Sequence, residues 1–163
     1  MKKLLLGIAA VCLAGFTFAQ DAPLWMRHSV ISPDGTTIAF TYKGDIYTVP
    51  VAGGRAMQIT TNPAYDTAPV WSPDSKRIAF ASDRMGSLDV YIVAKDGGEP
   101  RRLTTHSGSE TPLAFTDAGH VLFSAGIMPS AEAVVFPSNG QFNQVYRVSV
   151  EGGRPTMISS MPM

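Results

Sequence analysis

The feature that most constrains the fold of this chain is a stretch of sequence that returns after forty positions. Residues 30–40 read VISPDGTTIAF, residues 70–80 read VWSPDSKRIAF, and a weaker third copy, LAFTDAGHVLF, occupies residues 113–123. Further along each copy, the strings GDIYTVPVAGG, LDVYIVAKDGG and NQVYRVSVEGG also match. A period of this size indicates a chain built from structural repeats. The equivalent turn positions are Ser32, Ser72 and Thr116.

Each copy predicts four short antiparallel strands. In the second copy, Pro73-Asp74 predicts a tight turn, because proline presets φ and an aspartate side chain can hydrogen-bond its own backbone. The strings RIAFAS and DVYIVA are typical of strands, and Gly97-Gly98 ends the latter because glycine can adopt positive φ. A last short strand, PRRLT, is expected to turn Leu103 inward and to leave its two arginines in solvent.

These units predict an all-β fold, a β-propeller of four-stranded antiparallel blades. One sheet cannot cover both of its own faces, whereas neighbouring blades cover each other. A β-sandwich is the alternative for any run of short strands, and the near-identity of successive units favours the propeller. We expect three blades, at about residues 25–62, 65–105 and 111–159, within a partial propeller domain that spans residues 20–163.

Three blades predict an incomplete ring, because propellers close with about four to eight blades. We therefore expect an open arc whose first and third blades each leave an apolar face uncovered. Such faces drive self-association, unless the remaining blades come from a longer parent chain. On this hypothesis the 163 residues are one part of a larger protein.

Residues 1–19 are predicted to be a signal peptide, with an exported, periplasmic or secreted product. Lys2 and Lys3 precede an apolar run that ends at Phe18, and cleavage is expected after Ala19. A membrane anchor is the alternative, but the run is short for a span of about 20 residues. Cleavage would remove Cys12, the single cysteine, so the mature chain would hold neither a disulfide nor a thiolate nucleophile.

The third copy carries an insertion at residues 125–143. Phe123 and Val145 are 22 positions apart, whereas the equivalent residues of the first and second copies are 6 and 10 apart. Insertions in repeat proteins form loops on one face, which is often the binding face. An extended hairpin without a ligand is the alternative that the sequence leaves open.

A search for chemistry assigns no catalytic, cofactor-binding or metal-binding residue. The formal net charge of zero argues against nucleic acid as a partner. His28, His106 and His120 are dispersed and show no metal-ligand spacing. His106 shares a polar loop with Ser107, Ser109 and Glu110, but no nucleophile-elbow motif accompanies it, so we expect no catalytic triad there.

The other polar and aromatic repeats are explained structurally. Carboxylates that recur at the same place in every unit are expected to make turns or to cap the beginnings of strands, and glycine pairs that open no helix do not predict a phosphate site. Arginines after those glycines are expected to protect an exposed sheet edge, with an acidic partner as the alternative. Large apolar residues before the turns are expected to fill the space between blades. The recurring carboxylates are Asp34, Asp74, Asp117, Asp45 and Asp89, and the glycine pairs are Gly53-Gly54, Gly97-Gly98 and Gly152-Gly153. The arginines are Arg55, Arg101, Arg102 and Arg154, and the large apolar residues are Ile31, Trp71 and Phe115.

The repeats resemble the WD40-like PD40 propeller repeats of TolB, oligopeptidases and tricorn-type proteases. The resemblance rests on WSPDSKRIAF and ISPDGTTIAF with their following strands, and it covers about residues 25–159. A signal peptide followed almost directly by these repeats is similar to the N-terminus of secreted tricorn-like serine peptidases of the S41 type. That resemblance implies a propeller that guides or filters peptides for a catalytic part outside this chain, so whether this chain is itself enzymatic stays open.

Two alternatives remain from the same resemblance. One is a non-enzymatic, TolB-like protein-binding propeller, and the other is the propeller cap of a prolyl-oligopeptidase-like enzyme. The partners implied are a peptide or protein substrate, or the remaining domains of a longer parent chain. The resemblance implies no cofactor, and we expect no stable membrane span once the signal peptide is removed.

Overall fold

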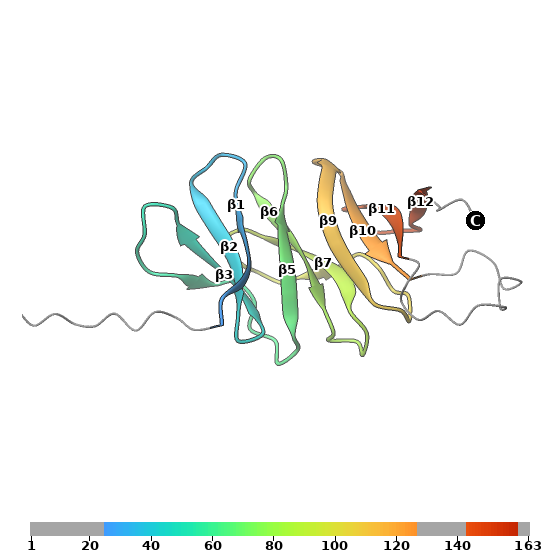
Figure 1. Ribbon diagram of the computed structural model, residues 1–163, viewed down its shortest axis with the longest axis horizontal. Helices are drawn as coiled ribbons and strands as arrows, with labels where there is room; N and C mark the ends of the chain where they lie inside the picture. The colour runs from blue at the N-terminus through green and yellow to red at the C-terminus, as the bar shows by residue number, and fades with distance from the viewer. Residues whose placement is uncertain (1–24, 127–142, 160–163) are drawn as a thin grey trace, which may run out of the picture.

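The computed structural model describes residues 25–126 and 143–159, which form three four-stranded sheets (Figure 1). Blade 1 consists of β1 (Arg27–Ile31), β2 (Thr37–Tyr42), β3 (Asp45–Pro50) and β4 (Met57–Gln58). Blade 2 consists of β5 (Asp66–Trp71), β6 (Arg77–Ser82), β7 (Asp89–Ala94) and β8 (Arg101–Arg102). Blade 3 consists of β9 (Glu110–Asp117), β10 (His120–Ala125), β11 (Gln144–Ser149) and β12 (Thr156–Ser159). The predicted signal peptide and nearly all of the insertion lie outside the described residues.

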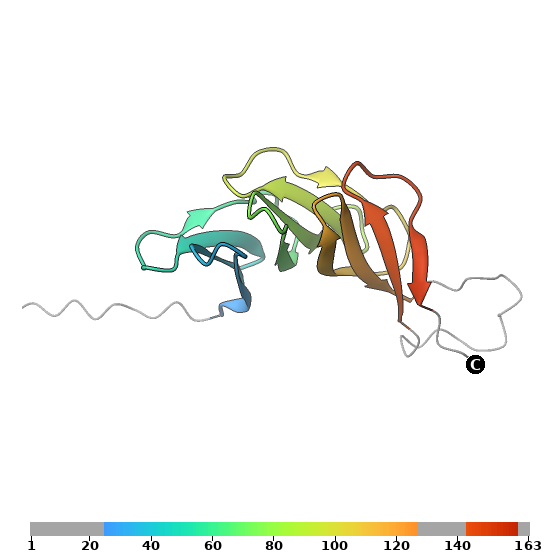
Figure 2. The ribbon, with the colours of Figure 1, turned by 90° about the horizontal axis from the view of Figure 1, so that it is seen from above.

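The strands of each blade follow one another as an antiparallel meander. The three sheets lie side by side along an arc that does not close (Figure 2). The first strands, β1, β5 and β9, contact one another in succession and form the inner edge of the arc. The predicted all-β propeller with an incomplete ring is therefore confirmed, and the sandwich alternative is wrong. No helix long and apolar enough to cross a membrane occurs in the described ranges.

The repeated turn is held by a buried serine and the aspartate that follows it. The Ser72 hydroxyl donates to Asp74 Oδ1 over 2.5 Å and accepts the Arg77 N–H over 2.9 Å. Ser32 makes the equivalent bonds in blade 1, to Asp34 Oδ1 over 2.5 Å and from the Thr37 N–H over 3.0 Å. These hydrogen bonds lower the pKa of both aspartates. The predicted role of these carboxylates in turn formation is confirmed.

The glycine pairs between the last two strands of each blade all adopt positive φ. The values run from 84° at Gly152 to 122° at Gly54. No other heavy atom crowds these two positions, so backbone conformation alone explains the choice of glycine. These turns open no helix within the described residues.

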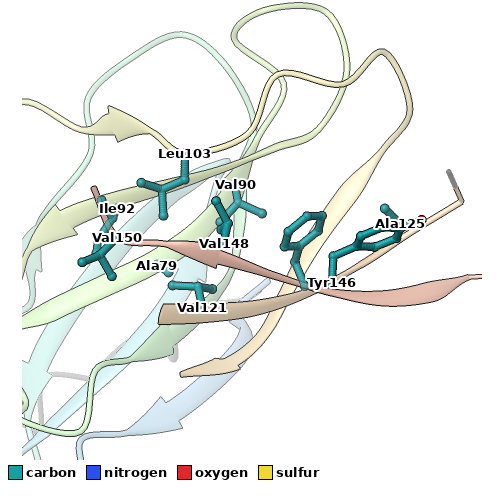
Figure 3. Close-up of a cluster of buried hydrophobic side chains, with 10 residues drawn as sticks. Ala79, Val90, Ile92, Leu103, Val121, Ala125, Tyr146, Val148 and Val150 are labelled. Atoms are coloured by element: carbon teal, nitrogen blue, oxygen red, sulfur yellow. The ribbon is translucent and has the colours of Figure 1, made fainter. Parts of the chain in front are cut away.

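Two hydrophobic clusters fill the spaces between neighbouring blades. In the cluster between blades 2 and 3, Val90, Ile92 and Leu103 meet Val121 and Tyr146 (Figure 3). The cluster between blades 1 and 2 is built from equivalent positions. Each blade also stacks one phenylalanine on one tyrosine, with ring centroids 5.6 to 5.9 Å apart. The core is therefore distributed over the junctions and does not lie within any one blade.

Trp71 and Phe115 pack into these clusters, as predicted. Trp71 is 8% exposed, and its indole N–H donates to the Val30 carbonyl over 3.2 Å, which joins blades 1 and 2. Phe115 packs against the cluster between blades 2 and 3. The expectation is wrong for Ile31, which is 57% exposed, because no sheet lies against that face of blade 1 in the described structure.

Candidate functional site at the blade junctions

Acidic residues gather where strands begin at the blade junctions. Asp45 and Asp89 begin the equivalent strands β3 and β7, and Asp66 and Glu110 begin the equivalent strands β5 and β9. The N–H groups of Asp66 and Glu110 donate to the carbonyls of Gly44 and Leu88 in the preceding blade, each over 2.7 Å. Asp66, Asp89 and Glu110 are fully buried. Each junction thus brings together two carboxyl groups from neighbouring blades.

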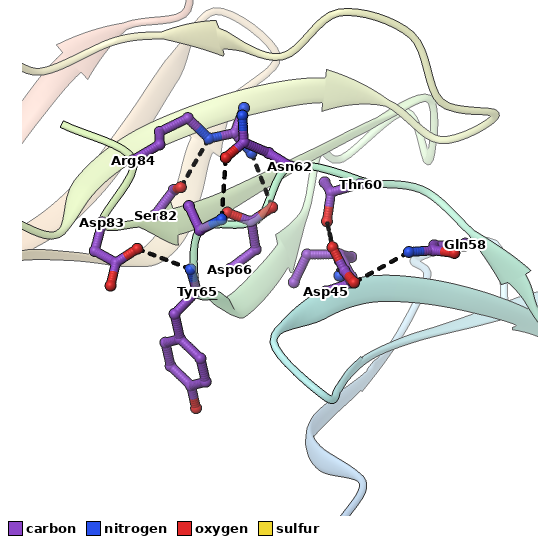
Figure 4. Close-up of polar contacts among 11 residues, drawn as sticks. Asp45, Gln58, Thr60, Asn62, Tyr65, Asp66, Ser82, Asp83 and Arg84 are labelled. Carbon is purple, nitrogen blue, oxygen red and sulfur yellow. Dashed lines mark hydrogen bonds and ion pairs between the residues drawn. The ribbon is translucent and has the colours of Figure 1, made fainter.

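At the first junction, Arg84 neutralises Asp66 (Figure 4). The Arg84 guanidinium lies 2.8 Å from Asp66 Oδ2, and its Nε donates to the Ser82 hydroxyl over 2.8 Å. It also lies 4.7 Å from the Tyr91 ring centroid and 5.6 Å from that of Phe80. The charge is therefore paired, hydrogen-bonded and covered by aromatic faces, which are the conditions that a buried ion pair needs.

Asp45 completes this cluster and makes no ion pair with any described residue. Its carboxylate accepts hydrogen bonds from the Gln58 amide over 3.0 Å and from the Thr60 hydroxyl over 3.3 Å. Burial raises its pKa, and the nearby Asp66 charge raises it further, while these two hydrogen bonds act in the opposite direction. Asp45 therefore ties β3 to the end of blade 1, a larger role than the predicted strand cap.

At the second junction, the arginine pairs with the other carboxylate. Arg102 Nη2 lies 2.8 Å from Asp89 Oδ2, and the arginine side chain is 28% exposed. We expected Arg102 to be in solvent at a sheet edge, and this is wrong because a fully buried Asp89 draws its guanidinium inward. Arg101 does face solvent, and it pairs with Glu151 of blade 3 over 2.8 Å.

At this second junction, Glu110 is the carboxyl group without an ion pair among the described residues. It is equivalent to Asp66, but the position equivalent to Arg84 is occupied by Ile127 in the sequence. The Thr104 hydroxyl faces the carboxyl group, yet no hydrogen bond of good geometry reaches either oxygen among the described residues. Burial raises the pKa of Glu110 to about 7, and the Asp89 charge adds to this, against the effects of Thr104 and Arg102.

Paired carboxyl groups can perform acid–base chemistry, but Asp66, Asp89 and Glu110 are fully buried, and only Asp45 is partly exposed. The placement of Glu110 in a polar loop beside His106 is also wrong, because Glu110 is the first residue of β9 and is fully buried. Its burial could have been predicted from its place in the repeat, because Glu110 occupies the position that Asp66 occupies in blade 2. The junction can take up and release a proton near neutral pH, and it can hold two blades together.

A polar groove of about 250 Å³ lies at the junction of blades 1 and 2. Residues 59–63, which link the two blades, form one wall, and residues 98–100 form another. Arg84 also lines the groove, with its charge already committed to Asp66. The groove therefore offers a ligand the exposed Glu99 carboxylate together with neutral hydrogen-bonding groups such as those of Asn62.

The three histidines lie apart, each with a local partner. His28 Nδ1 lies 3.1 Å from the Thr67 hydroxyl of blade 2. His106 Nδ1 accepts the Gly108 N–H over 3.0 Å, and His120 Nδ1 lies 3.0 Å from the Asp117 carboxylate. No group of three His, Cys, Asp or Glu side chains suited to a metal ion is found in residues 25–126 and 143–159.

The architecture defines the class of the protein, an open segment of a β-propeller. The chain belongs to the family described as the tricorn protease N-terminal beta propeller domain, whose model matches residues 23–162. It is 35% identical over 102 residues to tricorn protease homolog 1 of Streptomyces coelicolor, covering 62% of this chain and 9% of that protein. It is 30% identical over 129 residues to an uncharacterized peptidase of Bacillus subtilis, covering 78% of this chain and 20% of that protein. The chain therefore spans a fifth or less of these relatives.

Solved structures agree on the fold. A TolB-like protein of Agrobacterium tumefaciens superposes with a TM-score of 0.67 at 21% identity, over 82% of this chain and 49% of that chain. The tricorn protease superposes with a TM-score of 0.56 at 15% identity, over 76% of this chain and 13% of that chain. At these identities the likeness concerns the propeller architecture.

Proposed function

We propose that this chain is the N-terminal propeller segment of an exported tricorn-like serine peptidase, and that it guides or filters peptide substrates without cleaving them. The observation that carries the proposal is the family match over residues 23–162, supported by the relationship to tricorn protease homolog 1. The chain spans only 9% of that relative, so the catalytic part is assigned to a longer parent chain. Peptide handling falls to the accessible surfaces, chiefly the polar groove between blades 1 and 2.

Two experiments separate guiding from catalysis. The purified 163-residue chain is incubated with a broad peptide library, and mass spectrometry is expected to find no cleavage. Cleavage that disappears in a His106→Ala variant would contradict this assignment. Binding is then measured by fluorescence anisotropy with labelled unfolded peptides, and an Asn62→Trp change, which fills the groove, is expected to weaken it. Met85→Ala serves as the control, since Met85 is exposed and does not line the groove.

The proposed export is supported by the order of basic, apolar and small residues in positions 1–19. N-terminal sequencing of the exported product is expected to begin at Gln20. A membrane-bound product that retains Met1 would contradict the proposal.

A TolB-like binding module is the second candidate, because 55 residues are 44% identical to the Tol-Pal system protein TolB of Bordetella pertussis. The coding sequence after Met163 distinguishes the two. A PDZ-like segment and a serine peptidase support the peptidase, whereas further blades followed by a stop codon support the binding module. A G-x-S-x-G motif would instead indicate a prolyl-oligopeptidase-like enzyme.

A further inference from the structure

The polar groove between blades 1 and 2 carries one charged side chain that no described residue neutralises. Glu99 lines the groove, is exposed, and forms none of the ion pairs found among the described residues. Arg84 also lines the groove, but its side chain is only 12% exposed and its guanidinium lies 2.8 Å from Asp66. The rings of Phe80 and Tyr91 cover the same guanidinium. Glu99 is therefore the charge that a ligand in the groove meets first.

Two further carboxylates are bonded to residues that line the groove (Figure 4). The Thr60 hydroxyl donates to Asp45 over 3.3 Å, and Arg84 pairs with Asp66. Asp66 Oδ1 is buried and accepts no hydrogen bond from a described residue. Among the lining residues and their direct partners, the carboxylates of Asp45, Asp66 and Glu99 therefore stand against one guanidinium. A cleft with such an excess of negative charge attracts cations.

The basic residues that are nearest to Glu99 in the sequence do not neutralise it. Lys95, Arg101 and Arg102 each form an ion pair with another carboxylate. None of these three residues lines the groove. Within the part of the chain that the structure describes, the Glu99 carboxylate is thus left for a cation that a ligand brings.

The groove also has the size and the polar groups to hold part of an extended peptide. Its volume of about 250 Å³ lies just below the range of about 300–1,000 Å³ for small-molecule sites, so it takes a side chain and not a folded domain. Asn62 Oδ1 accepts the Ala64 N–H over 3.0 Å, which leaves the NH₂ group of Asn62 to donate. Pro63 and Pro100 stiffen the walls because the proline ring fixes φ, and a preformed site loses less entropy on binding.

We propose that the groove binds a cationic group of a peptide, an ammonium or a guanidinium, through the Glu99 carboxylate, while the Asn62 amide donates to a neighbouring peptide carbonyl. This inference rests on the proposed function, since it names the class of peptide that the groove takes. A lysine or arginine side chain and a free N-terminus present the same charge to Glu99. Peptides with such a group are bound in preference to neutral and acidic ones.

The test is calorimetric titration of the 163-residue chain with alanine-based pentapeptides that are acetylated at one end and amidated at the other. They differ only in a central lysine, arginine, norleucine or glutamate. The lysine and arginine peptides are expected to bind at least about fivefold more tightly than the norleucine peptide, which is the contribution of one accessible ion pair, and the glutamate peptide is expected to bind most weakly. A norleucine peptide with a free N-terminus shows whether the terminal ammonium serves as well as a side chain.

Two variants test the position of the cation. Glu99→Gln is expected to reduce the preference for lysine over norleucine to less than about twofold, with the affinity for the norleucine peptide unchanged. Glu99→Lys is expected to invert the preference, so that the glutamate peptide binds more tightly than the lysine peptide. A preference that survives Glu99→Gln, or a preference of the wild-type chain for the glutamate peptide, would overturn the assignment. Circular dichroism must show the wild-type sheet content for each variant.

Asp96→Asn is the matched control for Glu99→Gln. It removes the same charge from an exposed residue that also lies between β7 and β8 but does not line the groove. The preference for the lysine peptide is expected to stay at least about fivefold in this variant. A loss of preference as large as that in Glu99→Gln would show an effect of overall charge and contradict a site at Glu99.

The outcomes also separate this inference from the proposed function. Neutral, basic and acidic peptides that bind equally, and are all weakened by Asn62→Trp, would overturn the charge preference and leave peptide handling in place. A lysine peptide that binds through Glu99 but is also cleaved by the purified chain would uphold the site and contradict the proposed function. A charge preference that Asn62→Trp leaves unchanged would place the cation outside the groove and overturn this inference.

Discussion

Replacing Glu110 by glutamine is expected to stabilise the protein above neutral pH. Glu110 is fully buried at the start of β9, near the Asp89 carboxylate and the Arg102 guanidinium. Burial raises its pKa in the folded protein to about 7, from an ordinary value of 4.5. Folding therefore favours the protonated carboxyl group, and ionisation of Glu110 opposes folding.

The magnitude follows from the difference between the two pKa values. Between pH 4.5 and pH 7 the folded protein binds more protons at this site than the unfolded chain does, so stability falls as pH rises. The loss amounts to about 3 kcal/mol once the pH exceeds the folded pKa, with no further change above it. Glutamine has the shape of the protonated side chain and cannot ionise. The stabilisation by Glu110→Gln should therefore be near zero at pH 4.5 and approach about 3 kcal/mol at pH 8.

The assay is urea unfolding of both proteins at pH 4.5, 6, 7 and 8, at one protein concentration because self-association would also change apparent stability. Glu99→Gln is the control, since Glu99 is exposed and its removal should leave the pH profile unchanged. The difference between wild type and variant isolates Glu110 from the other groups that titrate in this range. A difference that stays constant from pH 4.5 to pH 8 would refute the reasoning.

Three other predictions concern stability at pH 7. Ser72→Ala removes the hydroxyl that bonds both the turn aspartate and a backbone N–H, so urea unfolding should show a loss of about 1 to 3 kcal/mol in the free energy of unfolding. Thr116→Ala, at the exposed equivalent position, is the control and should change stability by less than about 0.5 kcal/mol. Arg84→Met leaves the buried Asp66 charge without its partner and should lower the free energy of unfolding by about 3 to 5 kcal/mol. The double variant with Asp66→Asn should recover most of this loss in the same assay. A double variant as unstable as Arg84→Met would count against this pairing. Trp71→Ala should cost about 3 to 5 kcal/mol in calorimetric or denaturant unfolding, because it opens a cavity between blades 1 and 2, and a loss below about 1 kcal/mol would contradict its place in that core.

The sequence by itself determined the blade. Turn chemistry and alternation act over a few neighbouring residues, and they recur with the same spacing in each unit. The turn at Ser72 and Asp74 and the positive φ of the glycine pairs were therefore predictable, as was the packing of Trp71. The repeat also implied the stacking of sheets, because a meander with two apolar faces needs a neighbour on each side.

Only the tertiary structure decided which charged groups meet at the junctions. Arg84 and Arg102 both belong to blade 2, yet one pairs with the residue that begins β5 and the other with the residue that begins β7. Local patterns do not encode such contacts, because each joins side chains from different parts of the sheet, 18 positions apart for Arg84 and Asp66. The burial of Glu110 was hidden for the same reason, since its neighbours in sequence are polar loop residues. The exposure of Ile31 likewise depends on which face of blade 1 has a neighbouring sheet, and a chain written as three similar units does not by itself specify this.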